Sequence, residues 1–161
     1  MKQIVSSLIG DNLEENRYLL FRLAENIYAT PLLAVREVVE AIKPQAVPDA
    51  QKGFLGVIEI RGQVVGVEDL RIKFGHPLSV NPHLALLVFD TPNGPKAALV
   101  DKVESVQRIP SHLIDKKPNI NSLGTDSYIQ GIARINNQLI TLLDLVSCLT
   151  GSKTILNGNN L

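Results

Sequence analysis

One stretch of this sequence occurs twice, and the repeat constrains the fold more than any other feature. Residues 53–75 read GFLGVIEIRGQVVGVEDLRIKFG, and residues 131–151 read GIARINNQLITLLDLVSCLTG. The landmarks recur at a constant offset: Gly56 with Gly131, Ile60 with Ile135, Gln63 with Gln138, and Asp69-Leu70 with Asp144-Leu145. Because a whole supersecondary unit recurs, the sequence predicts an internal duplication, with two similar lobes related by a rough two-fold.

Each copy of the repeat is predicted to form a hairpin and then a short helix. In the first copy, apolar and β-branched runs flank Arg61-Gly62, and in the second Asn136-Asn137 occupies the turn. Gly and Asn tolerate positive φ, so both pairs suit a tight turn. The helices are expected over 70–74 and 145–150. An Asp caps and a Gly ends each one: Asp69 and Gly75, then Asp144 and Gly151.

The rest of the chain adds short strands separated by turn residues. Candidate strands lie at 18–23, 27–30, 35–42, 84–89, 96–103 and 104–109, with single helical turns after Pro31 and at 49–52. We expect residues 1–16 to be a tail or a short docking segment, 17–150 the folded domain, 111–128 a long loop within it, and 151–161 a disordered tail. The strand pattern predicts a small mainly β protein, a sandwich or paired barrels.

The composition argues against nucleic acid and membrane partners. The 16 basic residues balance the 16 acidic ones, so there is no basic field to attract an anionic polymer or bilayer. No apolar run approaches the ~20 residues of a membrane span, and the N-terminus lacks the pattern of a signal peptide. The single Cys148 favours a reducing compartment. We therefore expect a soluble, cytoplasmic protein.

Residues for catalysis are few. His76, His83 and His112 lie in proline-flanked connectors and none has a Cys or acidic residue at metal-ligand spacing, so they are interpreted as solvated loop residues. Cys148 lies on the apolar side of its predicted helix and is expected to be buried and inert. Nucleotide-binding and hydrolase motifs do not occur. The sequence predicts no catalytic, cofactor or metal site, and hence no enzyme.

Two surface features are less ordinary. Arg61 lies at the tip of the first hairpin, where Gly62 alone could supply the backbone freedom, so the turn does not explain the Arg. Val38 and Val39 are adjacent on a predicted strand, so they point to opposite faces. Either that strand is buried on both sides, or one valine belongs to an apolar contact patch.

At this level of detail the chain resembles the CheW-type coupling proteins of bacterial chemotaxis. The resemblance is carried by YLLFRLAENIYATPLLAVREVVE, VPDAQKGFLGVIEIRGQVVGVEDLRIKFG and GIARINNQLITLLDL, in this order, between Tyr18 and Leu149. It implies two SH3-like five-stranded barrels in a pseudo-two-fold arrangement around a shared apolar core. It also implies a non-enzymatic adaptor without cofactor, which couples the cytoplasmic tip of methyl-accepting chemoreceptors to the regulatory domain of the histidine kinase CheA.

Matched residue by residue, the resemblance places the receptor-binding surface at Val35, Glu37, Val38, Gly56, Arg61 and Gly62. Three positions depart from the family pattern: Glu59, Gly66 and Glu68. Glu59 points to the same strand face as Arg61 and could pair with it, and Glu68 must be solvated or partnered. Two alternatives stay open at this point: a scaffold of the same fold that binds the kinase but not receptors, and a small ligand-binding β-barrel.

Overall fold

The described part of the chain is built mainly from short strands. A computed structural model describes residues 16–78, 83–116 and 128–151. The strands are β1 (Arg17–Leu23), β2 (Asn26–Pro31), β3 (Val35–Glu40), β4 (Phe54–Ile60), β5 (Gln63–Asp69), β6 (Ala85–Thr91), β7 (Gly94–Val100), β8 (Lys102–Arg108), β9 (Ile114–Asp115), β10 (Ile129–Ile135) and β11 (Gln138–Leu143). The helices are η1 (Leu32–Ala34), α3 (Leu70–Phe74), η2 (Ser111–Leu113) and α4 (Leu145–Thr150).

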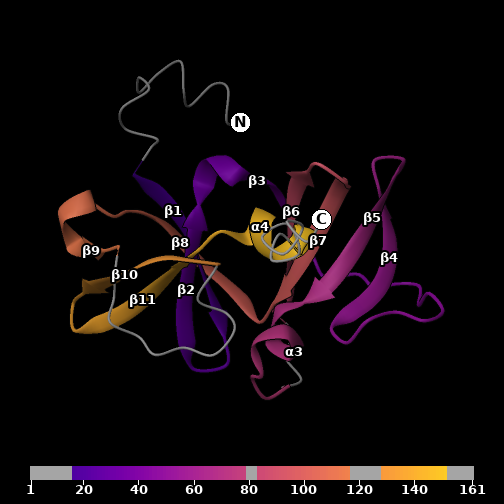
Figure 1. Ribbon diagram of the computed structural model, residues 1–161, viewed down its shortest axis with the longest axis horizontal. Coiled ribbons are helices and arrows are strands. Elements are labelled where there is room, and N and C mark those ends of the chain that lie inside the picture. Colours follow the sequence, from indigo (N-terminus) through magenta and orange to yellow (C-terminus); the bar gives the residue numbers. More distant parts are fainter. Residues whose placement is uncertain (1–15, 79–82, 117–127, 152–161) are drawn as a thin grey trace, which may run out of the picture.

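The strands form two sheets with the same internal order. Sheet A runs β8-β1-β2-β11-β10-β9, and sheet B runs β3-β6-β7-β5-β4. In sheet A, β11 pairs in parallel with β2, and in sheet B, β5 pairs in parallel with β7, while all other pairs are antiparallel. The hairpins β4–β5 and β10–β11 thus occupy equivalent places (Figure 1). The predicted duplication and mainly β fold class are confirmed.

The two sheets differ in how the chain builds them. Sheet B is formed by the continuous stretch from β3 to β7, whereas sheet A combines the first two strands with the last four. The chain enters sheet B through η1 and leaves it at Asp101, the single residue between β7 and β8. In Figure 1 sheet A lies on the left, sheet B on the right, and α4 between them.

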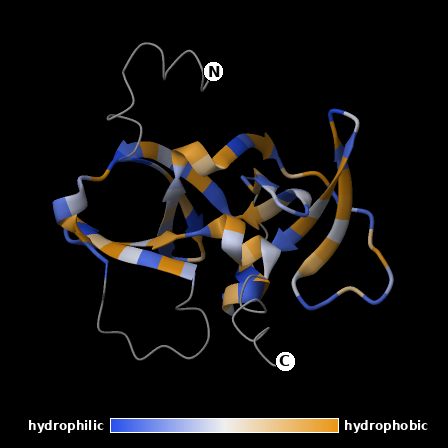
Figure 2. Cartoon of the chain, turned by 45° about the horizontal axis from the view of Figure 1, so that its top comes forward, coloured by the Kyte–Doolittle hydropathy of each residue, from blue (hydrophilic) through white to orange (hydrophobic). Residues whose placement is uncertain are grey.

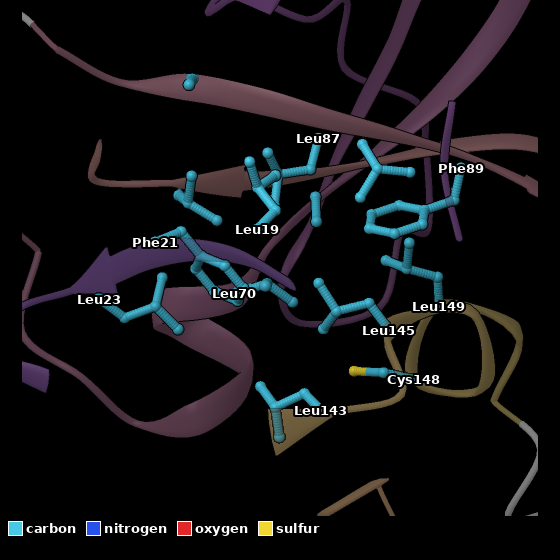
Figure 3. Packing of buried hydrophobic residues seen from close by; sticks show 14 of the residues in the cluster. Leu19, Phe21, Leu23, Leu70, Leu87, Phe89, Leu143, Leu145, Cys148 and Leu149 are labelled. Carbon is cyan, nitrogen blue, oxygen red and sulfur yellow. The ribbon is translucent and has the colours of Figure 1, made fainter. Parts of the chain in front are cut away.

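A shared apolar core joins the sheets. Strand β1 contributes Phe21, strand β6 contributes Phe89, and helix α3 contributes Leu70, each with no exposed surface. Helix α4 adds the buried Leu145, Cys148 and Leu149, as Figure 3 shows. Each sheet also covers a smaller aliphatic cluster of its own. Cys148 is therefore buried as expected.

Helices α3 and α4 begin and end at the predicted cap residues. The Asp69 carboxylate accepts a hydrogen bond from the Arg71 N–H, and the Asp144 carboxylate accepts one from the Ser147 N–H. Gly75 and Gly151 end the helices with φ of 72° and 67°. Local sequence chemistry is enough to fix these short helices, since cap and stop residues are both present.

Some sequence predictions need correction. Residues 49–52 form no helical turn but connect two turns, at 48–49 and 52–53, and the strand expected over 35–42 ends at Glu40. Residues 114–115, which fell within the predicted long loop, form a sixth strand in sheet A because they pair with β10. The predicted tails 1–16 and 151–161 lie outside the described residues, apart from Asn16 and Gly151, as do 117–127 of the loop.

Candidate functional site

The residues predicted for the receptor surface come from β3 and the β4–β5 hairpin, and they differ in their exposure to solvent. Val38, Arg61 and Gly62 are exposed. The Glu37 side chain is 18% exposed. Val35 is buried in the apolar core, and Gly56 is buried beneath the backbone of Gln45 and Ala46. Figure 2 shows the tip of the β4–β5 hairpin as a hydrophilic end of an otherwise largely hydrophobic pair of strands.

Gly56 has a structural reason to be glycine. Its φ is 133°, and a Cβ there would overlap the carbonyl oxygen of Gln45, which pairs with β4 at Val57. The equivalent Gly131 is crowded in the same way by Ile114 and Asp115 of β9. Both glycines allow a further backbone segment to approach the outer strand of its sheet.

The turn at Arg61-Gly62 corrects the expectation that Gly62 alone supplies the backbone freedom. Arg61 itself has φ of 51°, and Gly62 has φ of 78°. Asn136 and Asn137 in the second copy have φ of 51° and 63°, so both hairpins use turns with positive φ at both central residues. Arg is a poor residue for this conformation, which costs a residue with a Cβ roughly 1–2 kcal/mol.

Arg61 reaches back across the sheet to Glu37. Its Nη2 and Nε lie 3.3 Å and 3.4 Å from the Glu37 Oε2. The other oxygen of Glu37 is buried, accepts no hydrogen bond from any described residue, and lies 3.9 Å from the Nε of Arg36. The expected partner Glu59 is thus replaced by Glu37, because the left-handed turn and β3 bring these two side chains together. The pair fixes the direction of a guanidinium that is otherwise 75% exposed.

Val38 and Val39 divide between surface and core. Val39 packs against the aliphatic cluster of sheet B, and Val38 is 44% exposed. The alternative of a strand buried on both sides is therefore wrong. Beside Val38 lies a groove of about 620 Å³, which is lined by residues 38–41, 83–85 and 102–103. We call it the edge groove.

Glu68 is partnered, as its position required. Its carboxylate lies 2.9 Å from the Nζ of Lys73, and the same ammonium donates to the carbonyl of Cys148 at 2.8 Å. Lys96 donates to the next carbonyl, that of Leu149, at 2.7 Å. Two lysines therefore satisfy carbonyls at the C-terminal end of α4, and they connect that helix to α3 through Lys73 and to strand β7 of sheet B through Lys96. Burial is the largest single influence and opposes the charged form of Lys73, but the hydrogen bond to Glu68 and the charges of Glu68, Cys148 and Tyr128 together outweigh it, so the pKa of Lys73 is raised.

A buried ionic network at the return crossing was not predicted. Arg71 donates to both oxygens of Asp69 at 3.0 Å and 2.9 Å, and to Asp101 at 3.1 Å. Asp101 also accepts from the backbone N–H of Ala24 at 2.6 Å. All three charged side chains are less than a tenth exposed. The bond to Asp69 is the main cause that raises the pKa of Arg71. The network ties α3, the crossing and the β1–β2 turn together.

His76 is not a solvated loop residue. Its Nε2 lies 2.7 Å from the hydroxyl of Tyr28, and its ring packs edge-on against the Tyr28 ring. Tyr28 also contacts the rings of Phe21 and Phe74, and burial raises the pKa of its hydroxyl. His112 is exposed on η2, so it does not line the closed pocket that a ligand-binding barrel would need.

The comparison with protein families decides the family assignment. The CheW-like domain matches residues 17–152, which include every element described above. The chain belongs to the CheW-like family. Within that family, the six surface residues carried over from the resemblance fall on β3 and the β4–β5 hairpin of sheet B.

Curated CheW relatives cover most of the chain. "Chemotaxis protein CheW" of Helicobacter pylori is 30% identical over 134 residues, 83% of this chain and 81% of the relative. "Probable chemotaxis protein CheW" of Rhizobium etli is 26% identical over 146 residues, 90% of this chain and 92% of the relative. The crystal structure of the scaffolding protein TtCheW from Thermoanaerobacter tengcongensis has a TM-score of 0.75 at 23% identity, covers 83% of this chain and 86% of its own, and supports the fold.

The described residues contain neither a metal-binding cluster nor a membrane-spanning helix. In that part of the chain, no three His, Cys, Asp or Glu side chains gather as metal ligands. Nor does any described helix have the length and apolar character needed to cross a membrane.

Proposed function

We propose that this CheW-like protein is a non-enzymatic chemotaxis adaptor that couples the cytoplasmic tip of a methyl-accepting chemoreceptor to the regulatory domain of a CheA-type kinase. The family assignment and the names of its relatives support a role in chemotaxis. Both partners place it in the cytoplasm, at receptor arrays. A rigid double-sheet scaffold suits such a role because it holds two binding surfaces at fixed geometry.

The conformation of Arg61 is the observation that carries the receptor side of the proposal. An Asn would fill this turn position with less strain, as Asn136 does in the second copy. An Arg held in a strained conformation with an exposed guanidinium is better explained by a contact outside the chain than by the turn. Glu37 orients that guanidinium through the 3.3 Å ion pair.

The other predicted residues then take different parts. Val38 supplies exposed apolar area on β3, and Gly62 lets a partner approach the hairpin tip closely. Val35 and Gly56 are buried, so they act on a receptor contact through the backbone they position. An apolar contact beside an oriented charge is suited to bind one face of a helix and fix its register.

Calorimetric titration against a soluble receptor fragment and, separately, a CheA regulatory domain tests the proposal. Arg61→Ala is expected to weaken receptor binding by about tenfold or more, the range of a well-placed interface Arg, and to leave kinase binding unchanged. Arg134→Ala is the matched control, because Arg134 is exposed on the equivalent hairpin of sheet A. It should leave receptor binding unchanged.

The outcomes separate the alternatives. Equal receptor affinity for wild type and Arg61→Ala would remove Arg61 from the surface. Kinase binding without any receptor binding would identify a scaffold that does not contact receptors. Binding to neither partner would contradict the coupling function and leave the fold unaffected.

A further inference from the structure

Sheet A curls around a pocket that the proposed adaptor function does not use. The pocket has a volume of about 180 Å³ and lies between β1, β2, β8 and the turn of the β10–β11 hairpin. Its polar lining residues are Arg22, Glu104, Ser105, Gln107, Asn136 and Gln138. Residues of β8 and β11 line it together although β1 and β2 separate these strands in the sheet, so the sheet is strongly curved there. We call it the sheet A pocket.

The internal duplication places an equivalent region in sheet B. Phe21 of β1 pairs with Val103 of β8, and Phe89 of β6 pairs with Val35 of β3, beside a register shift in both ladders. Strand β8 therefore corresponds to β3 and β1 to β6, and the strand orders β8-β1-β2-β11 and β3-β6-β7-β5 match. The two sheets thus share one backbone framework in this region and differ in the side chains that fill it.

In sheet B an ion pair crosses the equivalent region. Arg61 at the hairpin turn reaches Glu37 on β3, with both its Nε and its Nη2 within 3.4 Å of one carboxylate oxygen. At the corresponding positions sheet A has Asn136 and Ser105. These two side chains are several atoms shorter, and both line the sheet A pocket. The pocket is therefore the space that an ion pair fills in the other half of the molecule.

Arg22 gives the pocket its chemical character. Its Nε donates to Glu104, and the same carboxylate oxygen lies 3.9 Å from the Nζ of Lys102. Glu104 is the one acidic residue that lines the pocket, so two cations face one anion. Among the described residues, the two Nη groups of Arg22 have no hydrogen-bond partner, and the side chain is 35% exposed. A guanidinium with free Nη groups matches the planar, paired oxygens of a carboxylate.

We propose that the sheet A pocket binds a carboxylate that carries a short aliphatic chain. The Nη groups of Arg22 donate to the carboxylate oxygens, and the side-chain amides of Asn136 and Gln138 supply further donors at the rim. The aliphatic chain lies against the pocket floor, which includes the buried Leu20 and Ile140. An apolar floor with a few convergent polar groups is the usual composition of a small-molecule site. The carboxylate belongs to a free small acid or to an acidic side chain of a partner protein.

NMR titration of the full chain with sodium butyrate tests the proposal. The methyl signals of Leu20 and Ile140 should shift saturably, and those of Val88 and Val65, at the equivalent positions of sheet B, should not shift. Butyramide has a similar size but no charge, and it should bind about tenfold more weakly or worse. Equal affinity for butyrate and butyramide, shifts of equal size in both sheets, or no saturable shift would overturn the proposal.

Matched variants test the role of Arg22. Arg22→Gln should lower butyrate affinity about tenfold or more, because it removes the charge and the paired Nη donors. Arg36→Gln removes an ion-paired guanidinium from sheet B, where Arg36 bonds Asp90, and should leave butyrate affinity unchanged. Ser105→Glu combined with Asn136→Arg gives sheet A the residues that form the ion pair in sheet B, and it should abolish binding. Unchanged butyrate affinity in Arg22→Gln would overturn the proposal.

The same variant identifies the source of the carboxylate. If Arg22→Gln also weakens binding of the CheA regulatory domain or of the receptor fragment, the ligand is an acidic side chain of that protein. If it weakens butyrate binding alone, the ligand is a free small acid. The inference goes beyond the adaptor function and needs neither partner. Binding to neither partner would contradict the coupling function and leave the butyrate result intact.

Discussion

Replacing Arg71 by Met tests whether the buried ionic network holds the two sheets together. The substitution keeps the length and apolar stem of the side chain but removes three hydrogen bonds to Asp69 and Asp101. The carboxylates stay buried, each with a backbone N–H donor, from Arg71 itself and from Ala24. The variant therefore contains two buried carboxylates that have lost their bonds to the guanidinium of residue 71.

The expected cost is about 3–5 kcal/mol, the range measured when one partner of a buried ion pair is removed. Three charge-assisted bonds at about 1.5–3 kcal/mol each would give more, but the surviving backbone donors limit the loss. For a chain of this size, about 2–4 °C in melting temperature accompanies each kcal/mol, so the shift should be on the order of 10 °C. Small domains have only about 5–15 kcal/mol in total.

Urea unfolding followed by circular dichroism measures the loss, with Arg36→Met as the control. Arg36 pairs with Asp90 at the surface at 3.2 Å, so its loss should cost at most about 1 kcal/mol. Adding Asp101→Asn to Arg71→Met should cost less than the sum of the two single changes, because both changes remove the same ionic bond between Arg71 and Asp101. If Arg71→Met is no more destabilising than Arg36→Met, the network does not stabilise the junction.

Three further predictions concern single features of the fold. Gly56→Ala should lower the free energy of unfolding, measured with heat or urea, by roughly 3 kcal/mol or more because a Cβ would overlap Gln45. Gly62→Ala has open space around it and should cost only about 1–3 kcal/mol from its positive φ. Equal losses for the two variants would contradict the close approach of Gln45 to Gly56. Thr30→Val should leave the free energy of unfolding unchanged or raise it, since the buried Thr30 hydroxyl has no hydrogen-bond partner among the described residues. A loss of more than about 1 kcal/mol in the same unfolding measurement would reveal such a partner. Burial raises the pKa of all three tyrosines. Stability that is present below their ordinary pKa near 10 should therefore be lost as pH rises through the higher pKa values of the folded state. Absorbance titration should show the tyrosines ionising above their ordinary pKa, and ionisation at the ordinary pKa would refute this.

Local chemistry made much of the fold predictable. The capped helices, the two hairpins and the repeat could all be inferred because each depends on residues adjacent in sequence, such as Asp69 and Gly75 around α3. The duplication then gave the correct fold class, because two copies of one hairpin-helix unit need equivalent neighbours.

Long-range pairing explains what sequence patterns could not provide. Nothing near Arg71 in sequence indicates Asp101, and nothing near Tyr28 indicates His76, because these partners meet only when the sheets assemble. The same holds for Arg61. Strand alternation pointed to Glu59 as its partner, but the turn conformation and the position of β3 select Glu37. Burial of Val35 and Gly56 likewise depends on the neighbouring strands.

Sheet B is formed by a continuous stretch that lies in sequence between the two parts of sheet A, and this order has a consequence for folding during synthesis. Sheet B is complete once residue 100 has left the ribosome, whereas sheet A needs both ends of the chain, since Ile27 pairs with Ile140 in the β2–β11 ladder. The β1–β2 hairpin, made first, must therefore wait with an open β2 edge until β11 is synthesised, and α4 then closes the shared core. An open edge is the kind of surface through which nascent chains associate, so ribosome release and chaperone binding matter most for this sheet.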